Sequence, residues 1–177
     1  ILIDVSLRNH IPRTAKADVT NEEVAMRIGE SINDIAAKER GEAMELMIEG
    51  ASKVIQDLCN RGEIKGVIGY GGSVGLEITS SVMKSLPFGF PKVIVTTIAG
   101  AAGKYIEAKD IVIFPSITDL VGGEQINRIE AITLANAAGA ICGMANAIPK
   151  LPSQRPLIVM SQFGVTTPHV QKAKEIL

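Results

Sequence analysis

Cysteine, histidine and aromatic side chains are scarce in this chain of 177 residues. It contains two cysteines and two histidines, and 3% of its residues are aromatic. Two cysteines cannot build the disulfide framework of a small secreted domain, and neither His10 nor His169 has a second ligand candidate at a metal-binding spacing. The sequence therefore argues against secretion and against a metal site of histidine and cysteine, and we expect a cytoplasmic protein.

A strong net charge is also absent. Eighteen basic side chains face nineteen acidic ones, which leaves a formal charge of −1. Nucleic-acid binders commonly use a basic surface and aromatic stacking platforms, so we expect no nucleic-acid partner. The hydrophobic fraction of 46% excludes a disordered chain and allows a sizeable core, and the length fits one domain with the start of a second.

No segment has the strongly apolar composition of a membrane span. The long apolar stretch from Ile129 to Ile148 carries Glu130, Asn136 and Asn146 and consists mainly of alanine and glycine. About 20 strongly apolar residues are needed to cross a bilayer, and alanine and glycine contribute little to insertion. We therefore predict a buried helix here, with Cys142 inside it, and no membrane association.

Short apolar runs alternate with helical patterns along the chain. The spacing predicts strands at 1–5, 66–70, 92–97 and 111–114, and helices at 20–29, 42–60, 75–85 and 125–147. Thr20 and Glu23 have the spacing of a capping box at the start of the first helix, the helix at 42–60 is amphipathic, and Gly62 stands where its C-cap is expected. The strands are apolar on both faces, which is typical of a parallel sheet covered by helices on both sides. We predict a doubly wound, Rossmann-like α/β fold, in which ligands bind outside the carboxyl ends of the strands.

Prolines divide the chain near its end. Pro149 and Pro152 predict a linker at 149–155, after an α/β domain at 1–148. Beyond the linker, the apolar run at 156–161 predicts a further strand, and Thr166-Thr167-Pro168 predicts the capped start of a helix. Residues 156–177 are therefore predicted to be the first strand and helix of a second α/β lobe.

The most informative motif is Gly71-Gly72-Ser73-Val74-Gly75, between a predicted strand and a predicted helix. Free N–H groups at a helix start, together with the helix dipole, favour an anion, and glycines allow a close approach to the backbone. The spacing departs from the dinucleotide fingerprint, and no phosphate-loop motif is present. We interpret the loop as a phosphate site; the alternative is that the glycines only form a tight turn.

Other strand ends offer weaker candidates. Thr96 and Thr97 place two hydroxyls in line with the glycine loop, although threonine is common in strands for its propensity alone. Asp119 could bind a ribose hydroxyl or a magnesium-bound water, but it could equally cap a turn. Lys104 could neutralise a phosphate or remain a solvated charge. No nucleophile with its base is evident, so enzymatic activity stays open.

Four separated motifs together resemble a known family. They are VIGYGGSVG at 67–75, PKVIVTT at 91–97, LANAAGAI at 134–141 and FGVTTP at 163–168. In this order they resemble the Tm-one-like ATP-binding domain family, named after the N-terminal domain of the tomato mosaic virus resistance protein. The resemblance covers essentially the whole chain.

The resemblance implies a nucleotide-binding, two-lobed and dimeric α/β protein, which in the plant relative binds a viral replication protein. Carried onto this chain, the nucleotide would be held by Gly71, Gly72 and Ser73 and by the Thr96-Thr97 strand end, with ATP as the ligand and Mg²⁺ as its candidate companion. The family begins with a further strand and turn that are not in this sequence, so we expect 1–148 to lack its first strand-helix unit.

We therefore predict an ATP-binding domain with Gly71, Gly72, Ser73, Gly75, Thr96, Thr97 and Asp119 at its site. Two alternatives remain at this point. One is a dimeric scaffold without nucleotide chemistry, for which the small residues of the 131–147 helix could form the homodimer contact instead of packing on the sheet. The other is an enzyme that acts on a phosphorylated metabolite.

Overall fold

A computed structural model describes residues 1–8, 15–119, 126–148 and 158–177. It divides into two compact units, Ile1–Ala147 and Ile148–Leu177. The predicted linker at 149–155 lies entirely outside the described residues, as do His10 and the first two residues of the strand predicted at 156–161.

Three helices precede the sheet. Helix α1 (Asn21–Met26) begins at the predicted capping box, in which Thr20 and Glu23 exchange side-chain and backbone hydrogen bonds. Helix α3 (Arg40–Asn60) is the predicted amphipathic helix, and Gly62 follows it with a φ of +69°, as a left-handed C-cap requires. Between them lies α2 (Ile32–Ala37), a short helix that the sequence pattern did not predict.

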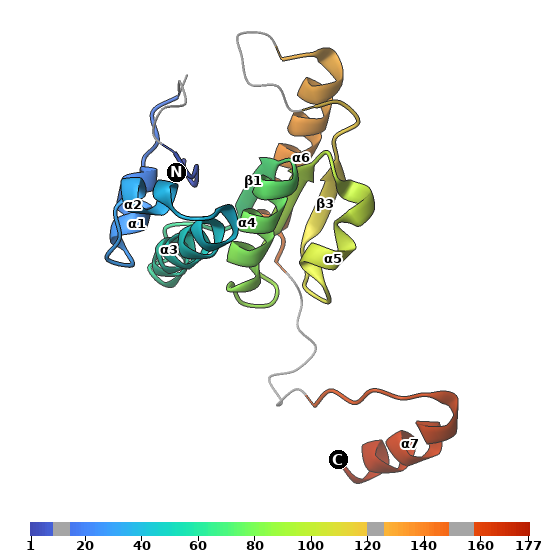
Figure 1. Cartoon of the computed structure of the whole chain (residues 1–177). Helices are drawn as coiled ribbons and strands as arrows, with labels where there is room; N and C mark the ends of the chain where they lie inside the picture. The colour runs from blue at the N-terminus through green and yellow to red at the C-terminus, as the bar shows by residue number, and fades with distance from the viewer. Residues whose placement is uncertain (9–14, 120–125, 149–157) are drawn as a thin grey trace. The chain divides into compact units, whose positions relative to one another are not determined.

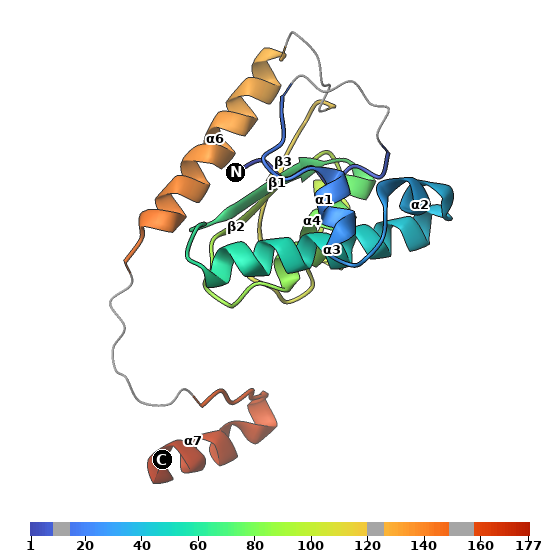
Figure 2. The ribbon, with the colours of Figure 1, turned by 90° about the vertical axis from the view of Figure 1, so that its left-hand side faces the viewer.

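The sheet has three parallel strands, β1 (Val67–Gly71), β2 (Lys92–Thr96) and β3 (Val112–Pro115), in the order β1-β2-β3. Helix α4 (Ser73–Lys84) connects β1 to β2, and the 3₁₀ turn η1 (Ala99–Ala101) and α5 (Gly103–Ile106) connect β2 to β3. Helix α6 (Arg128–Asn146) packs on the face of the sheet opposite to α4 (Figures 1 and 2). The structure confirms the predicted α/β fold with a parallel sheet between helices.

The central strand anchors the core. All five residues of β2 are buried, because β1 and β3 flank it and helices cover both faces. Lys92, at its first position, is fully buried, and its Nζ donates to the carbonyl oxygens of Pro87 and Phe90, at 2.9 Å each. The same Nζ lies 3.0 Å from the carboxylate of Asp110. These partners satisfy the buried charge.

Two predicted strands are not formed. Residues 1–5 make only one isolated parallel bridge, between Ile3 and Val19, and Ile158–Ser161 have no strand assignment. Both segments lack a neighbouring strand in the described part of the chain, and backbone pairing is what distinguishes a strand from an extended segment. In the same unit as Ile158–Ser161, 3₁₀ turn η2 (Gly164–Thr166) leads into α7 (Thr167–Ile176), which starts within the predicted Thr166-Thr167-Pro168 and has Pro168 in its first turn, although no side chain caps it.

Helix α6 is far more exposed than predicted. Only Glu130 and Ala137 are buried, and Cys142, predicted to be a buried hydrophobe, is exposed, while Cys59 is half-buried. One side of α6 packs on the sheet, and the residues on its other side are exposed, Ile129 and Ile132 among them. None of the helices in the described ranges combines the length and the apolar composition that a membrane span requires.

Candidate functional site

The three strands end level with one another. The register pairs Gly71 of β1 with Thr96 of β2, and Thr96 with Pro115 of β3. The residues that follow each strand therefore gather at one edge of the sheet, the carboxyl edge, where doubly wound folds bind their ligands.

The glycine loop is built by close approaches of its own backbone. Gly71 has a φ of +154°, and a Cβ there would lie 2.9 Å from the Cα of Gly75. A Cβ at Gly75 would in turn lie 3.1 Å from the carbonyl oxygen of Tyr70. A side chain at Gly71 would open the turn, so this glycine is required by the fold whether or not a ligand binds, while a side chain at Gly75 would press on the backbone of Tyr70.

Gly69 has a related structural role. A Cβ at this position of β1 would lie 2.6 Å from Cγ2 of Thr79, on α4. The Thr79 hydroxyl donates to the carbonyl oxygen of Gly75 at 2.6 Å. The sequence did not single out Thr79, because a back-bonded threonine inside a helix has no sequence signal of its own.

Gly72 differs from its neighbours, because space rather than backbone surrounds it. Its φ of −76° suits any residue, and the nearest atom to a Cβ there would be Oγ1 of Thr97, at 3.7 Å. Gly72 is the N-cap of α4, no side chain caps this helix start, and its first turn holds no acidic residue. The first N–H groups of a helix have no acceptor within it, so the loop presents free donors and a positive dipole end.

The predicted hydroxyls are not equivalent. Thr96 is fully buried, and its Oγ1 accepts the N–H of Ile98 at 3.1 Å. Thr97 is half-buried beside Gly72, and Ser73 is exposed at the first position of α4. The structure therefore brings Thr97 to the glycine loop, while Thr96 forms the turn that follows β2.

The predicted charged candidates make no hydrogen bond or ion pair with the glycine loop among the described residues. Asp119 is exposed and precedes the gap at 120–125. Lys104 is exposed in α5. The binding roles of all these residues stay predictions, and the part of the chain that is described contains no group of three or more His, Cys, Asp or Glu side chains that could hold a metal ion.

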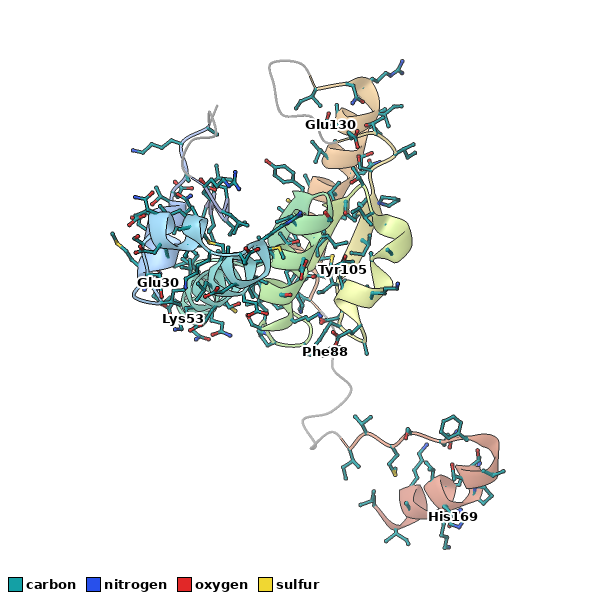
Figure 3. The ribbon with its side chains drawn as sticks, viewed as in Figure 1. Glu30, Lys53, Phe88, Tyr105, Glu130 and His169 are labelled. Atoms are coloured by element: carbon teal, nitrogen blue, oxygen red, sulfur yellow. The ribbon has the colours of Figure 1, made fainter. Side chains whose placement is uncertain are left out.

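A buried acid near the same edge was missed. Glu130 is 5% exposed at the N-terminal end of α6 (Figure 3). Its N–H donates to Oδ1 of Asn127 at 2.9 Å, and Nδ2 of Asn127 donates back to the Glu130 carboxylate at 3.3 Å. The spacing Asn127-x-x-Glu130 is a capping signal that could have located this helix start, and the contacts give Glu130 a capping role.

Comparison with known proteins places the chain in a family. A sequence profile described as "Uncharacterised protein family (UPF0261) N-terminal domain" matches residues 1–150. The chain belongs to the UPF0261 family. It is 39% identical over 180 residues to the UPF0261 protein of Clostridium tetani, and 36% identical over 179 residues to that of Rhizobium meliloti; each alignment covers all of this chain and 43% of the relative.

The tomato proteins implied by the motif resemblance also match. The ToMV susceptible protein tm-1(GCR26) of Solanum lycopersicum is 37% identical over 147 residues, which cover 78% of this chain and 19% of that protein. The resemblance is thus confirmed at the level of the family. The UPF0261 chain spans less than half the length of these curated relatives, and ATP binding stays a prediction.

Proposed function

We propose that this UPF0261 domain binds the phosphates of a nucleotide, with ATP as the ligand, at the start of α4. The observation that supports the proposal most is the open N-cap at Gly72. Free N–H donors of the first turn face a position that has room for at least a Cβ and that Thr97 borders. Phosphate oxygens are the acceptors that such a helix start prefers.

The residues present fit phosphate better than a protein-bound metal. The first turn of α4 carries no carboxylate to repel an anion, and no acidic cluster among the described residues offers a cation site of its own. Mg²⁺ would therefore be bound mainly through the phosphates that it accompanies. Within this proposal, Gly72, Ser73 and Thr97 contact the phosphate oxygens, and Gly71 and Gly75 keep the turn closed.

The experiment is a calorimetric titration of the full-length protein with ATP, with and without Mg²⁺. The variant Gly72→Val fills the space beside Thr97, so we expect at least about a tenfold loss of affinity, which corresponds to about 1.4 kcal/mol. Gly41→Val is the matched control, because Gly41 lies in α3 and a Cβ there would have no neighbouring atom within 4 Å, and it should bind like the wild type.

Three results would redirect the proposal. If Gly72→Val binds ATP as tightly as the wild type while circular dichroism shows an intact fold, the loop is not the phosphate site. A phosphorylated metabolite that displaces ATP from the wild type would favour an enzyme acting on that metabolite. A protein indifferent to every phosphate compound would favour the dimeric scaffold.

A further inference from the structure

A cavity of about 330 Å³ lies at the start of α3. Three segments line it: the stretch before α1, the end of α2 with the residue that caps it, and the first turn of α3. The lining residues are Leu7, Arg8, Ala36, Lys38, Arg40 and Ala43. No residue of the glycine loop is among them. A cavity of this volume suits a small metabolite.

The charged side chains that line this cavity are all cationic. Arg8, Lys38 and Arg40 come from the three different segments, and no aspartate or glutamate is among the described residues that line the cavity. A concave surface with charges of one sign concentrates its field and attracts the opposite charge. The cavity therefore favours an anionic ligand.

The two arginines supply charge that no acidic residue neutralises. Nζ of Lys38 lies 2.7 Å from the carboxylate of Glu42, so the lysine is already paired. In the described part of the chain, no ion pair or hydrogen bond involves the guanidinium of Arg8 or Arg40, whereas Arg61, at the other end of α3, has its Nε 2.7 Å from a glutamate carboxylate. Both free guanidiniums offer the planar fork of donors that matches a carboxylate or a phosphate.

The remaining lining of the cavity is apolar. Ala43 is 3% exposed, and Leu7 is half-buried against the same hydrophobic cluster. Together with Ala36, these side chains offer no hydrogen bond, so they suit the carbon atoms of a ligand rather than its charge. An inorganic ion would leave this part of the cavity uncovered. A small organic molecule with an anionic group matches both parts.

We propose that this cavity binds a small organic anion, a metabolite whose carboxylate or phosphate group lies between Arg8 and Arg40 and whose apolar part contacts Leu7 and Ala43. It is a second ligand site, separate from the phosphate site proposed at Gly72, and it does not depend on nucleotide binding there.

The cavity lies at the end of the fold where the glycine loop also lies. Helices α3 and α4 both end at the amino edge of the sheet, because each leads into a strand, and near these ends Nε2 of Gln56 donates to the carbonyl oxygen of Ser85 at 3.5 Å. Counted back from this contact at about 1.5 Å per residue, Arg40 lies about 24 Å away along α3 and Ser73 about 18 Å away along α4. Both helices therefore begin on the carboxyl side, where Figure 2 shows α2 beside the start of α3.

Ligand-observed NMR of the full-length protein at constant ionic strength tests the cavity. The probes are butyl phosphate and butyrate, which share an apolar chain and differ in their anionic group, and inorganic phosphate, which lacks the chain. We expect saturable binding of butyl phosphate or butyrate, and the tighter of the two identifies the anionic group. Inorganic phosphate should bind more weakly than butyl phosphate, and equal affinity would contradict the role of Leu7 and Ala43.

The variants Arg8→Gln and Arg40→Gln should each raise the dissociation constant of the tighter probe at least about fivefold. Both arginines are exposed and have no partner to lose in the described chain, so the substitutions should leave the fold intact. Arg40→Lys should have a smaller effect, because it keeps the charge and loses only the fork. Arg61→Gln is the matched control and should bind like the wild type.

The same titrations in Gly72→Val separate this cavity from the glycine loop. Probe binding that persists in Gly72→Val and still depends on Arg40 supports the cavity, whatever the outcome for ATP. Probe binding that disappears in Gly72→Val and is unchanged in both glutamine variants would assign the probe to the glycine loop and overturn the proposal. An equal loss in Arg61→Gln, or no saturable binding of any probe at millimolar concentrations, would also overturn it.

Discussion

Gly72→Asp should stabilise the protein and strongly weaken phosphate binding at the same time. A Cβ at Gly72 would have no neighbour closer than 3.7 Å, so there is room for the side chain of an aspartate. Its carboxylate would accept the free N–H groups of the first turn of α4. It would thereby occupy the place that we assign to a phosphate oxygen.

The expected stabilisation can be estimated. Aspartate is a better N-cap than glycine by a few tenths of a kcal/mol, and a negative charge at a helix start adds about 0.3–1 kcal/mol. The sum is about 0.5–1 kcal/mol, which raises the melting temperature by about 1–4 °C in a domain of this size. Repulsion between the new charge and a phosphate about 4 Å away costs about 1–4 kcal/mol, depending on the effective dielectric constant, and weakens ATP binding about 10- to 1,000-fold.

Gly72→Asn is the matched control, because asparagine caps a helix as well as aspartate does but adds no charge. We expect it to stabilise the fold slightly and to weaken ATP binding less than Gly72→Asp. Thermal unfolding and calorimetric titration of the full-length variants measure both effects. Unchanged ATP affinity in Gly72→Asp would refute the site, and a large destabilisation by both variants would refute the geometry of the N-cap.

Three further predictions concern the framework of the site. Gly71→Ala should destabilise the protein by about 1–3 kcal/mol, because Gly71 has a φ of +154° and a Cβ there would press on Gly75. The control variant Gly41→Ala should be neutral or stabilising. Equal unfolding midpoints for the two variants would contradict this reasoning. Asp110→Ala should cost about 2–3 kcal/mol in denaturant unfolding, because it removes the carboxylate from the fully buried Lys92, and a cost within about 0.5 kcal/mol would count against the anchor. Partial burial raises the pKa of Asp110, but hydrogen bonds from Gly89 N–H and Lys92 Nζ outweigh this effect and lower the pKa below its ordinary value. The contribution of Asp110 to stability should therefore be complete at neutral pH and be lost as the pH falls below about 4. The difference in unfolding free energy between the wild type and Asp110→Asn should consequently narrow in acid.

Local signals predicted the elements that local contacts determine. The Thr20 and Glu23 capping box and the glycine at position 62 mark helix ends, because caps are made within a few residues. The segments 1–5 and 158–161 have strand composition but no strand neighbour among the described residues, and pairing is a tertiary property that composition does not determine. Helix α6 was predicted to be buried from its apolar composition, although its packing leaves most of it exposed.

In the candidate site, too, the sequence predicted the local features but not those that depend on tertiary packing. Residues 71–75 indicated the strand-to-helix turn, and the structure assigns different roles to the individual glycines, which only their distances to Gly75, Tyr70 and Thr97 reveal. The sequence could not distinguish Thr96 from Thr97, because which hydroxyl closes the turn depends on backbone direction after β2. The contact between Gly69 and Thr79 likewise depends on how α4 packs against β1.

The ammonium group of Lys92, at the start of β2, also affects the position of residues at the other end of this strand. A slip of β2 by one residue would reverse the facing of every side chain along it, and would move this charge away from the carboxylate of Asp110, which precedes β3. The buried charge of Lys92 therefore fixes the register of β2, and this register determines where the hydroxyl of Thr97 lies. An insertion or deletion in the 86–91 turn should consequently alter ligand binding at the glycine loop, at the opposite end of the strand.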